Sequence, residues 1–267
     1  MTLKAIAVLL RHHWRCHRMP LLPMAAALAL FEFLLTRIAP APDEVGWIQA
    51  LLAALPPELL ALAGDQSGAV SPAGFLALGY GHPFFLLLLG AWTIRVPCGA
   101  LAGEIGWGTM DLLAARPAGR SVHVTAAYVA LGLGLAALVG AAWSGSAVGL
   151  AIRPLGLGAR QLLPVVAMAW LLFMALGALG VLVSATRPDG GSAIGWLSGI
   201  FATSFVLEYL ARLWKPIAAL HPLSLFAYYT PQRILIAGPD GLDAVRLTVV
   251  IVVTLAAAVL WFDRRDL

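Results

Sequence analysis

The sequence predicts an all-α polytopic membrane protein with six transmembrane helices. Of its 267 residues, 61% are hydrophobic and only 11% are charged, whereas a soluble domain carries about 25% charged residues. Apolar runs long enough to cross a bilayer recur from one end of the chain to the other. This composition excludes a soluble fold, and it also excludes a soluble domain held by one membrane anchor.

Six spans follow from the apolar runs, because about 20 helical residues at 1.5 Å each cross the hydrocarbon core. All belong to a single transmembrane domain over residues 1–267. The expected spans are 19–38, 73–101, 122–152, 161–185, 192–213 and 244–262.

The segment 1–18 before the first span is expected to be an amphipathic helix lying on the inner leaflet. Its apolar residues recur at helical spacing, and its basic residues suit lipid phosphates. Those basic residues are Lys4, Arg11, Arg15 and Arg18. A cleaved signal peptide is the rival interpretation, but Glu32 interrupts the apolar region and Ala39-Pro40-Ala41 is a poor cleavage site.

Charge sets the expected orientation. Four basic residues precede the first span, while the connection from Ala39 to Ser71 has four acidic residues and no Lys or Arg. By the positive-inside rule we expect both termini to be cytoplasmic. The apolar part of that outer connection is broken by Pro56-Pro57 and favours an interfacial helix over a span.

The external connection between spans five and six, Arg212 to Asp243, is unusually apolar. Its core, His221 to Ile236, is too broken by proline for a span and too apolar for a solvated loop. A re-entrant or interfacial helical pair fits, because irregular backbone at membrane depth must be buried against protein or a cavity.

Residue types for catalysis are missing from the sequence. It has no metalloprotease, hydrolase or Cys-x-x-Cys motif, and Cys16 and Cys98 are too far apart in sequence for a metal motif. Residues 114–121 only faintly resemble a P-loop, since Ala114 replaces the first glycine and Arg120 the lysine. We therefore expect no catalytic residue, no metal and no bound cofactor, and the basic balance reflects membrane topology rather than nucleic acid.

The cytoplasmic connection between spans two and three carries the main positive signal. A helix over Glu104–Ala115 would place Ile105, Thr109, Leu112 and Leu113 on one face. Pro117 and Gly119 would end it, and Arg120 would mark re-entry into the membrane. Such a helix is suited to docking in a groove of a soluble partner, and an interfacial helix without a partner is the alternative.

This connection resembles the signature of ABC-2 type transporter permeases. The matching residues are Glu104, Gly108, Thr109, Leu113, Pro117 and Arg120. The family's architecture, with an amphipathic N-terminal helix, six spans and a membrane-dipping helical pair between spans five and six, is similar to the one expected here. The resemblance implies that Glu104–Ala115 is a coupling helix inserted into a separate ATPase subunit, which would bind ATP and Mg. Two copies of each subunit would then form the transporter, an exporter.

Span five carries small residues at intervals of four, namely Gly191, Gly195, Gly199 and Thr203. Such a stripe lets helix backbones approach closely in lipid. It predicts a homodimer seam, or alternatively close packing within one subunit.

Ionisable residues inside spans point to function by default. Glu32 in span one has no basic partner at helical spacing, so it is expected to face a pathway or an arginine from another helix. Glu208 in span five precedes Arg212 by four residues, and an ion pair between them is expected.

Three functions remain open from the sequence. The first is the permease subunit described above. The second is an ABC-type module that transmits ATP-driven motion to a periplasmic partner, for instance in metalloenzyme maturation, through 39–71 and 212–243. The third is an ion-coupled secondary transporter that depends on Glu32 or Glu208, against which the sparse intramembrane charge argues.

Overall fold

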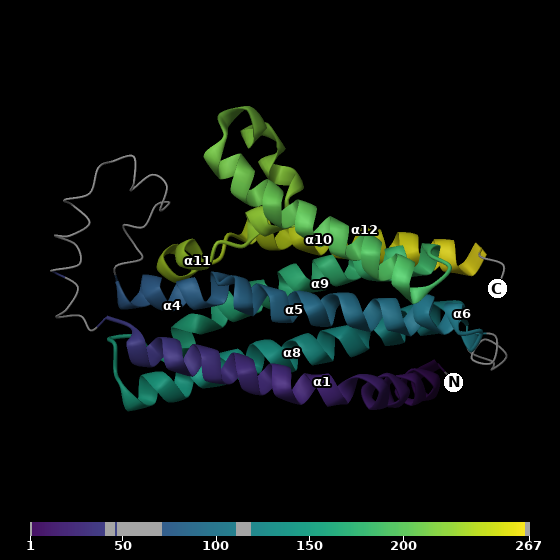
Figure 1. Ribbon diagram of the computed structural model, residues 1–267, viewed down its shortest axis with the longest axis horizontal. Helices are drawn as coiled ribbons and strands as arrows, with labels where there is room; N and C mark the ends of the chain where they lie inside the picture. Colours follow the sequence, from purple (N-terminus) through teal and green to yellow (C-terminus); the bar gives the residue numbers. More distant parts are fainter. Residues whose placement is uncertain (1, 41–45, 47–70, 111–118, 265–267) are drawn as a thin grey trace.

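The computed structural model describes residues 2–40, 46, 71–110 and 119–264, and the regular structure within these ranges is all helical. Six segments are long and apolar enough to cross a membrane. The helices lie side by side, and both termini lie at the same end of the molecule (Figure 1). We call this end the inner end and the opposite one the outer end. The architecture is that of a multi-pass helical membrane protein, so the predicted fold class is confirmed at this level.

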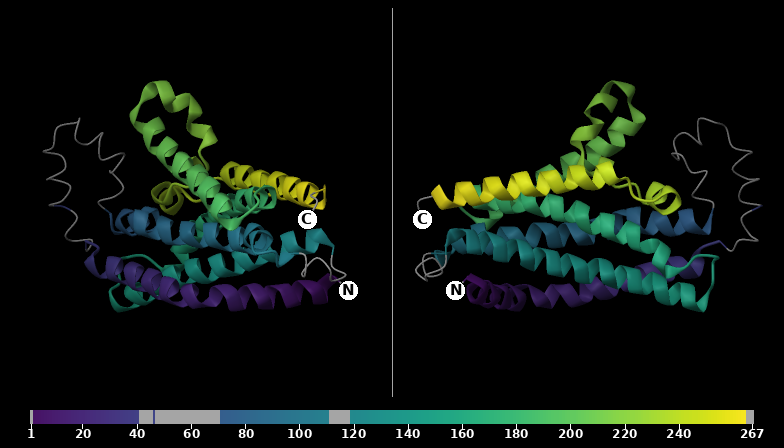
Figure 2. Two further views of the ribbon diagram at one scale, coloured as in Figure 1. Left: turned by 45° about the vertical axis from the view of Figure 1, so that its right-hand side comes forward. Right: turned by 180° about the vertical axis from the view of Figure 1, so that it is seen from behind.

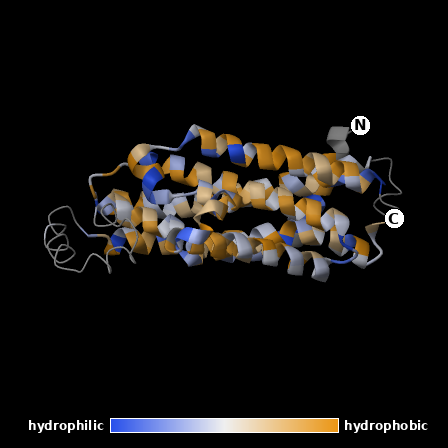
Figure 3. Ribbon diagram, turned by 90° about the horizontal axis from the view of Figure 1, so that it is seen from above, coloured by the Kyte–Doolittle hydropathy of each residue, from blue (hydrophilic) through white to orange (hydrophobic). Residues whose placement is uncertain are grey.

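The predicted spans agree with the structure to within five residues at each end. The structural segments are His17–Ile38, Pro72–Gly106, Ser121–Ile152, Ala159–Thr186, Gly190–Ala211 and Gly241–Arg264. Apolar residues run along most of the length of these helices (Figure 3).

The first helix, α1 (Thr2–Ile38), is longer than predicted. The predicted span over 19–38 agrees with the apolar segment His17–Ile38, and the residues before it belong to the same helix, which continues through Pro20 and Pro23. In its N-terminal part, Leu9 packs in a small apolar cluster with Val122 and Ala126 of α8. Contact with a second helix therefore covers part of the apolar face that was assigned to lipid. The position of 1–18 relative to a membrane surface stays a prediction.

The second span is built from several helical pieces in one line. They are α4 (Pro72–Gly81), α5 (Pro83–Pro97), the π-helix η1 (Cys98–Gly103) and α6 (Glu104–Gly106). The break between α4 and α5 lies at His82, whose side chain accepts a hydrogen bond from the Phe84 amide and caps α5. Pro83 occupies the first turn of α5, where its missing amide costs no hydrogen bond.

The centre of the molecule is α9 (Leu163–Thr186), which follows the short 3₁₀ helix η2 (Ala159–Leu162). Around it pack α5, α8 (Arg120–Ile152) and α12 (Gly241–Arg264). The largest apolar cluster spans these elements and includes the fully buried side chains of Phe85, Leu135 and Phe173. Close van der Waals packing stabilises such a core in a bilayer, because lipid tails are as apolar as the side chains themselves.

The helix α10 (Gly190–Leu213) behaves differently, because its outer part leans away from the bundle (Figure 2). Three short helices connect it to α12: η3 (Lys215–Leu223), η4 (Leu225–Tyr228) and α11 (Pro231–Ala237). Of these, α11 packs against α4, and η4 contacts α9, α10 and α12. The connection is helical in short pieces, and its depth in a membrane stays a prediction.

Candidate functional site

The predicted coupling helix over Glu104–Ala115 is interrupted within its described part, and residues 111–115 lie outside the described residues. The helix α6 ends at Gly106, and Gly108 adopts a positive φ of 70°. The Thr109 amide donates to the Glu104 carbonyl at 3.0 Å, and the Gly108 amide donates to the Ile105 carbonyl at 3.0 Å. This pair of bonds is the Schellman arrangement that ends a helix on glycine. Helical periodicity does not predict this interruption, whereas the left-handed conformation that Gly108 readily adopts explains it.

The turn that follows α6 is fixed by the side chain of Glu104. The hydroxyl of Thr109 donates to the Glu104 carboxylate and also lies 3.1 Å from the Glu104 carbonyl oxygen. The other carboxylate oxygen lies 3.4 Å from Nε2 of His12 on α1. One carboxylate therefore joins the end of the second span to the N-terminal part of the first. We call Glu104–Thr109 the inner turn.

The side chains of the inner turn point differently from the prediction. Ile105 packs partly buried against the apolar cluster of Leu101 and Phe262, and Thr109 is engaged with Glu104. The exposed apolar residue is Trp107, which is 79% exposed. Trp107 is absent from the residues predicted from sequence, and the only signal near it is Gly108, a residue type that commonly ends helices in a left-handed turn.

Of the four remaining predicted coupling residues, the structure describes only the backbone of Arg120. Leu112, Leu113 and Pro117 lie outside the described residues. Arg120 begins α8, with Gly119 as the N-cap residue, so the predicted re-entry into a span at Arg120 agrees with the helix start.

Histidines gather at the inner end beside this turn. The rings of His12 and His13 are 5.8 Å apart, and those of His13 and His17 are 6.5 Å apart. Burial, helped by the neighbouring His12 and His17, lowers the pKa of His13 to about 4. His13 is therefore neutral at pH 7. Within the part of the chain that the structure describes, no group of three or more His, Cys, Asp or Glu could hold a metal ion.

The glycine stripe of α10 faces away from the rest of the chain. A Cβ atom at Gly195 or Gly199 would have no atom within 4 Å, and one at Gly191 would meet only the Asp189 side chain. Gly195, Gly199 and Thr203 line an open groove of about 840 Å³ whose far wall includes Leu223 and Leu225. Gly195 and Gly199 therefore do not serve close packing within this subunit.

Glu32 is fully buried, but its neighbours differ from those expected. Its Oε2 accepts a 3.3 Å hydrogen bond from Ser146, whose hydroxyl also lies 2.9 Å from the Tyr80 hydroxyl. Tyr229 in turn donates to the Tyr80 carbonyl at 3.1 Å, and burial raises the pKa of Tyr229. The expected arginine partner is not found among the described residues, and the α10 groove is not lined by Glu32. The group ties α1, α4 and α8 together near the outer end.

Glu208 pairs with a residue that the sequence analysis did not suggest. Its Oε2 lies 2.9 Å from Nε2 of His221 on η3, without the alignment of a hydrogen bond. The Arg212 side chain lies outside the description, so the expected Glu208–Arg212 pair is untested. The contact with His221 connects the outer end of α10 to η3.

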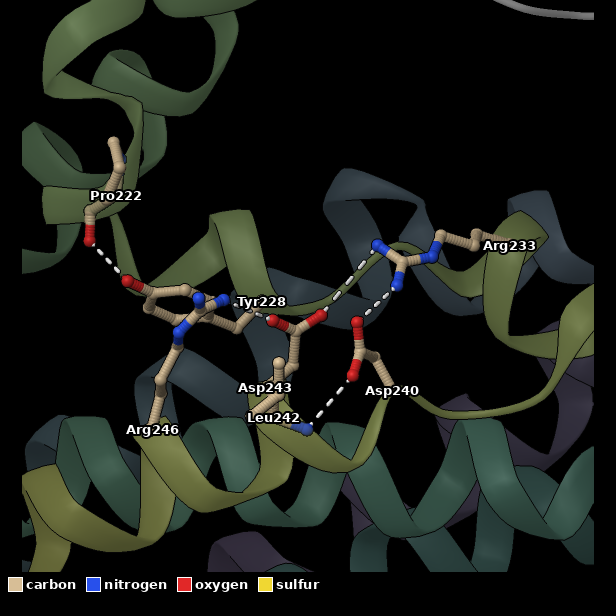
Figure 4. A network of polar contacts seen from close by, with 7 residues as sticks. All are labelled: Pro222, Tyr228, Arg233, Asp240, Leu242, Asp243 and Arg246. Carbon is tan, nitrogen blue, oxygen red and sulfur yellow. Dashed lines mark hydrogen bonds and ion pairs between the residues drawn. The ribbon is translucent and has the colours of Figure 1, made fainter.

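A polar network holds the outer connection onto the start of α12 (Figure 4). Arg233 contacts Asp240 at 2.7 Å and Asp243 at 3.8 Å. Arg246 contacts Asp243 at 3.0 Å and lies over the Tyr228 ring. The Leu242 amide and then the Arg233 side chain lower the pKa of Asp240. The network fixes the outer connection to the start of α12.

No protein-family model matches the sequence, and a comparison with curated proteins gives no match either.

Proposed function

We propose that this chain is the transmembrane permease subunit of an ABC-2 type transporter, an exporter driven by a separate ATPase subunit. The observation that carries the proposal is the inner turn. An exposed tryptophan stands on a glycine turn that hydrogen bonds and the Glu104 carboxylate hold in place. The sequence resemblance to the ABC-2 signature covers the same residues, Glu104, Gly108 and Thr109.

Trp107 is the residue that we expect to contact the ATPase. Tryptophan is enriched among the few residues that dominate protein interfaces, and a preformed turn reduces the entropy lost on docking. A tryptophan anchored in lipid headgroups would not need the contact from Glu104 to Thr109, because membrane-interface tryptophans act through their own amphipathic ring.

Force applied at the inner turn would reach two spans at once. The turn continues the second span through η1, and Glu104 contacts His12 on the first helix. Motion of the ATPase would therefore displace both helices together. ATP and Mg would be bound by the partner subunit, since this sequence has no P-loop.

The working complex would contain two copies of this chain, in contact along α10. The support is the open groove beside Gly195 and Gly199, where no atom of the same chain comes near the missing Cβ positions. Small residues at intervals of four allow close approach of a second helix in lipid. Both termini would be cytoplasmic, with the inner end facing the ATPase in the bacterial inner membrane.

The test is co-purification and ATPase stimulation with a P-loop ATPase encoded beside this chain. Trp107→Ala should weaken association by about 30-fold, the loss of about 2 kcal/mol typical of a dominant interface residue. Glu104→Gln should lower stimulation, because the turn loses its charge-assisted hydrogen bond.

Trp261→Ala is the matched control, since Trp261 is an exposed tryptophan near the inner end of α12. If Trp107→Ala retained full association and stimulation, the coupling role of the inner turn would be wrong. Transport without any ATPase, together with a requirement for Glu32, would instead support the ion-coupled alternative.

A further inference from the structure

The helix of the second span widens just before the inner turn. Residues Cys98–Gly103 form the π-helix η1 between α5 and α6. A π-turn holds one more residue than an α-turn, and such turns are rare and concentrate at functional sites. The widening lies directly between the membrane part of the span and the turn that carries Trp107.

A side chain from another helix is bonded into this widened turn. The hydroxyl of Ser184 on α9 donates to the Pro97 carbonyl at 2.7 Å and accepts from the Ala102 amide at 2.9 Å. Pro97 and Ala102 are five residues apart, which is the spacing that a π-turn bonds directly. One hydroxyl therefore bonds to both main-chain groups and bridges the π-turn.

The site around Ser184 is closed on all sides by protein. Ser184 is 0% exposed, and Cys98 and Ala102 pack in an apolar cluster with Ala193 and Leu197 of α10. A Cβ at Gly190, in the first turn of α10, would lie 3.3 Å from the Cα of Gly103. The widened turn is therefore held between α9 and α10.

The π-turn affects the direction in which the inner turn points. Each residue of an α-helix advances the chain by about 100° around the axis. Closing η1 to an α-turn would take up one residue fewer and rotate Glu104 and Trp107 by about that angle. The contact between Glu104 and His12, which joins side chains at 3.4 Å, depends on the present rotation.

We propose that Ser184 is a positioning residue, which holds η1 open and thereby sets the rotation of the inner turn. Through it, α9 and α10 control whether Trp107 faces the partner. The link to ATPase coupling rests on the proposed function, whereas the positioning itself is a property of this chain alone.

The test on the chain alone is hydrogen exchange of the full-length protein in detergent, resolved to single amides. Ser184→Ala should speed exchange at Ala102 by about tenfold, the loss of one buried hydrogen bond. It should also speed exchange at Gly108 and Thr109 by a similar factor, because the rotated turn loses the contact between Glu104 and His12 that helps to hold it. Ser184→Thr, which keeps the hydroxyl, should restore protection.

Thr93→Val is the matched control, because it removes a buried hydroxyl of α5 whose hydrogen bond among the described residues goes to the Leu89 carbonyl of its own helix. It should leave all three amides unchanged. A change at Ala102 without one at Gly108 and Thr109 would overturn the proposal, since Ser184 would then satisfy the backbone locally and nothing more. No change at any of the three amides would also overturn it.

The second measurement uses the complex with the ATPase subunit. Ser184→Ala should retain association but lower ATPase stimulation severalfold, and Thr93→Val should not. Unchanged stimulation despite faster exchange at Gly108 and Thr109 would overturn the role in coupling. If the wild-type chain bound no ATPase, the proposed function would fail, while the exchange experiment would still decide whether Ser184 positions the turn.

Discussion

The helices α9 and α10 have the same length of 24 residues and follow each other in the sequence, yet they meet opposite surroundings. In α9, 72% of the most apolar stretch is buried inside the chain, while in α10 the share is 22%. Both are apolar enough to cross a membrane. Hydrophobicity therefore identifies both helices as able to cross a membrane. Whether protein covers a helix depends instead on the size and position of its side chains.

The glycines show the same difference at the level of single atoms. In α8, a Cβ at Gly145 would overlap the Ala29 carbonyl of α1, and one at Gly134 would overlap the Trp92 ring. In α10, Gly195 and Gly199 have open space at the same position. Gly134 and Gly145 of α8 therefore permit close contact within the chain. Gly195 and Gly199 of α10 leave a surface open.

The largest expected effect concerns the packing of α8 against α1. Gly145→Ala should destabilise the chain by about 3 kcal/mol, because the new methyl group meets main chain that cannot move aside as a side chain can. The measurement is reversible unfolding in detergent by a denaturant or by heat.

Gly140→Ala provides the control, since Gly140 lies in the same helix with nothing within 4 Å of its Cβ position. It should change stability by less than about 1 kcal/mol. Equal losses for the two variants would mean that α1 and α8 are not packed as described.

A second prediction uses the buried His13 on the packed face of α1. Its pKa of about 4 lies below the ordinary value of 6.5, so between these values the unfolded chain binds more protons than the folded one. Stability should therefore fall as the pH drops below 6.5, by about 2 kcal/mol at pH 5.

The check is the unfolding midpoint at pH 7.5 and pH 5 for the wild type, His13→Gln and the control His82→Gln. His13→Gln should reduce the loss on acidification, and His82→Gln should not, because His82 is exposed. An unchanged pH dependence in His13→Gln would mean that His13 is not buried in its neutral form.

The smallest effect on folding is expected from a substitution in the groove beside α10. Gly199→Leu should leave the stability of the chain within about 1 kcal/mol of the wild type, since its side chain enters the groove. It should nevertheless weaken self-association, because the larger side chain keeps a second helix at a distance.

The measurement is the monomer–dimer equilibrium in detergent, compared with Gly140→Leu. Self-association that is unaffected by Gly199→Leu would remove α10 from the dimer seam.

The six helices were predictable from the sequence because each rests on a long local property, an apolar run bounded by charge or proline. Span ends such as His17–Ile38 agree closely for this reason. The continuity of α1 through Pro20 and Pro23 was not predictable in the same way. Its N-terminal part packs on α8, and such tertiary contacts leave no periodic signal of their own.

The candidate site was found by its sequence position but wrongly described in its shape. Glu104, Gly108 and Thr109 belong to the end of a short helix and the turn after it. Gly108, which has a positive φ, is the residue that indicates this turn. The contacts that involve His12, Ser184 and His221 join residues far apart in the sequence or on separate elements. Only the folded arrangement of helices reveals them.

We propose that Trp107 contacts an ATPase subunit at the inner end. A photoreactive residue placed at position 107 in intact cells tests it directly, with position 261 as the control. The account predicts a covalent adduct at 107 with a protein that carries a P-loop, identified by mass spectrometry, and no such adduct at 261. Adducts with lipid alone at position 107 would contradict the account.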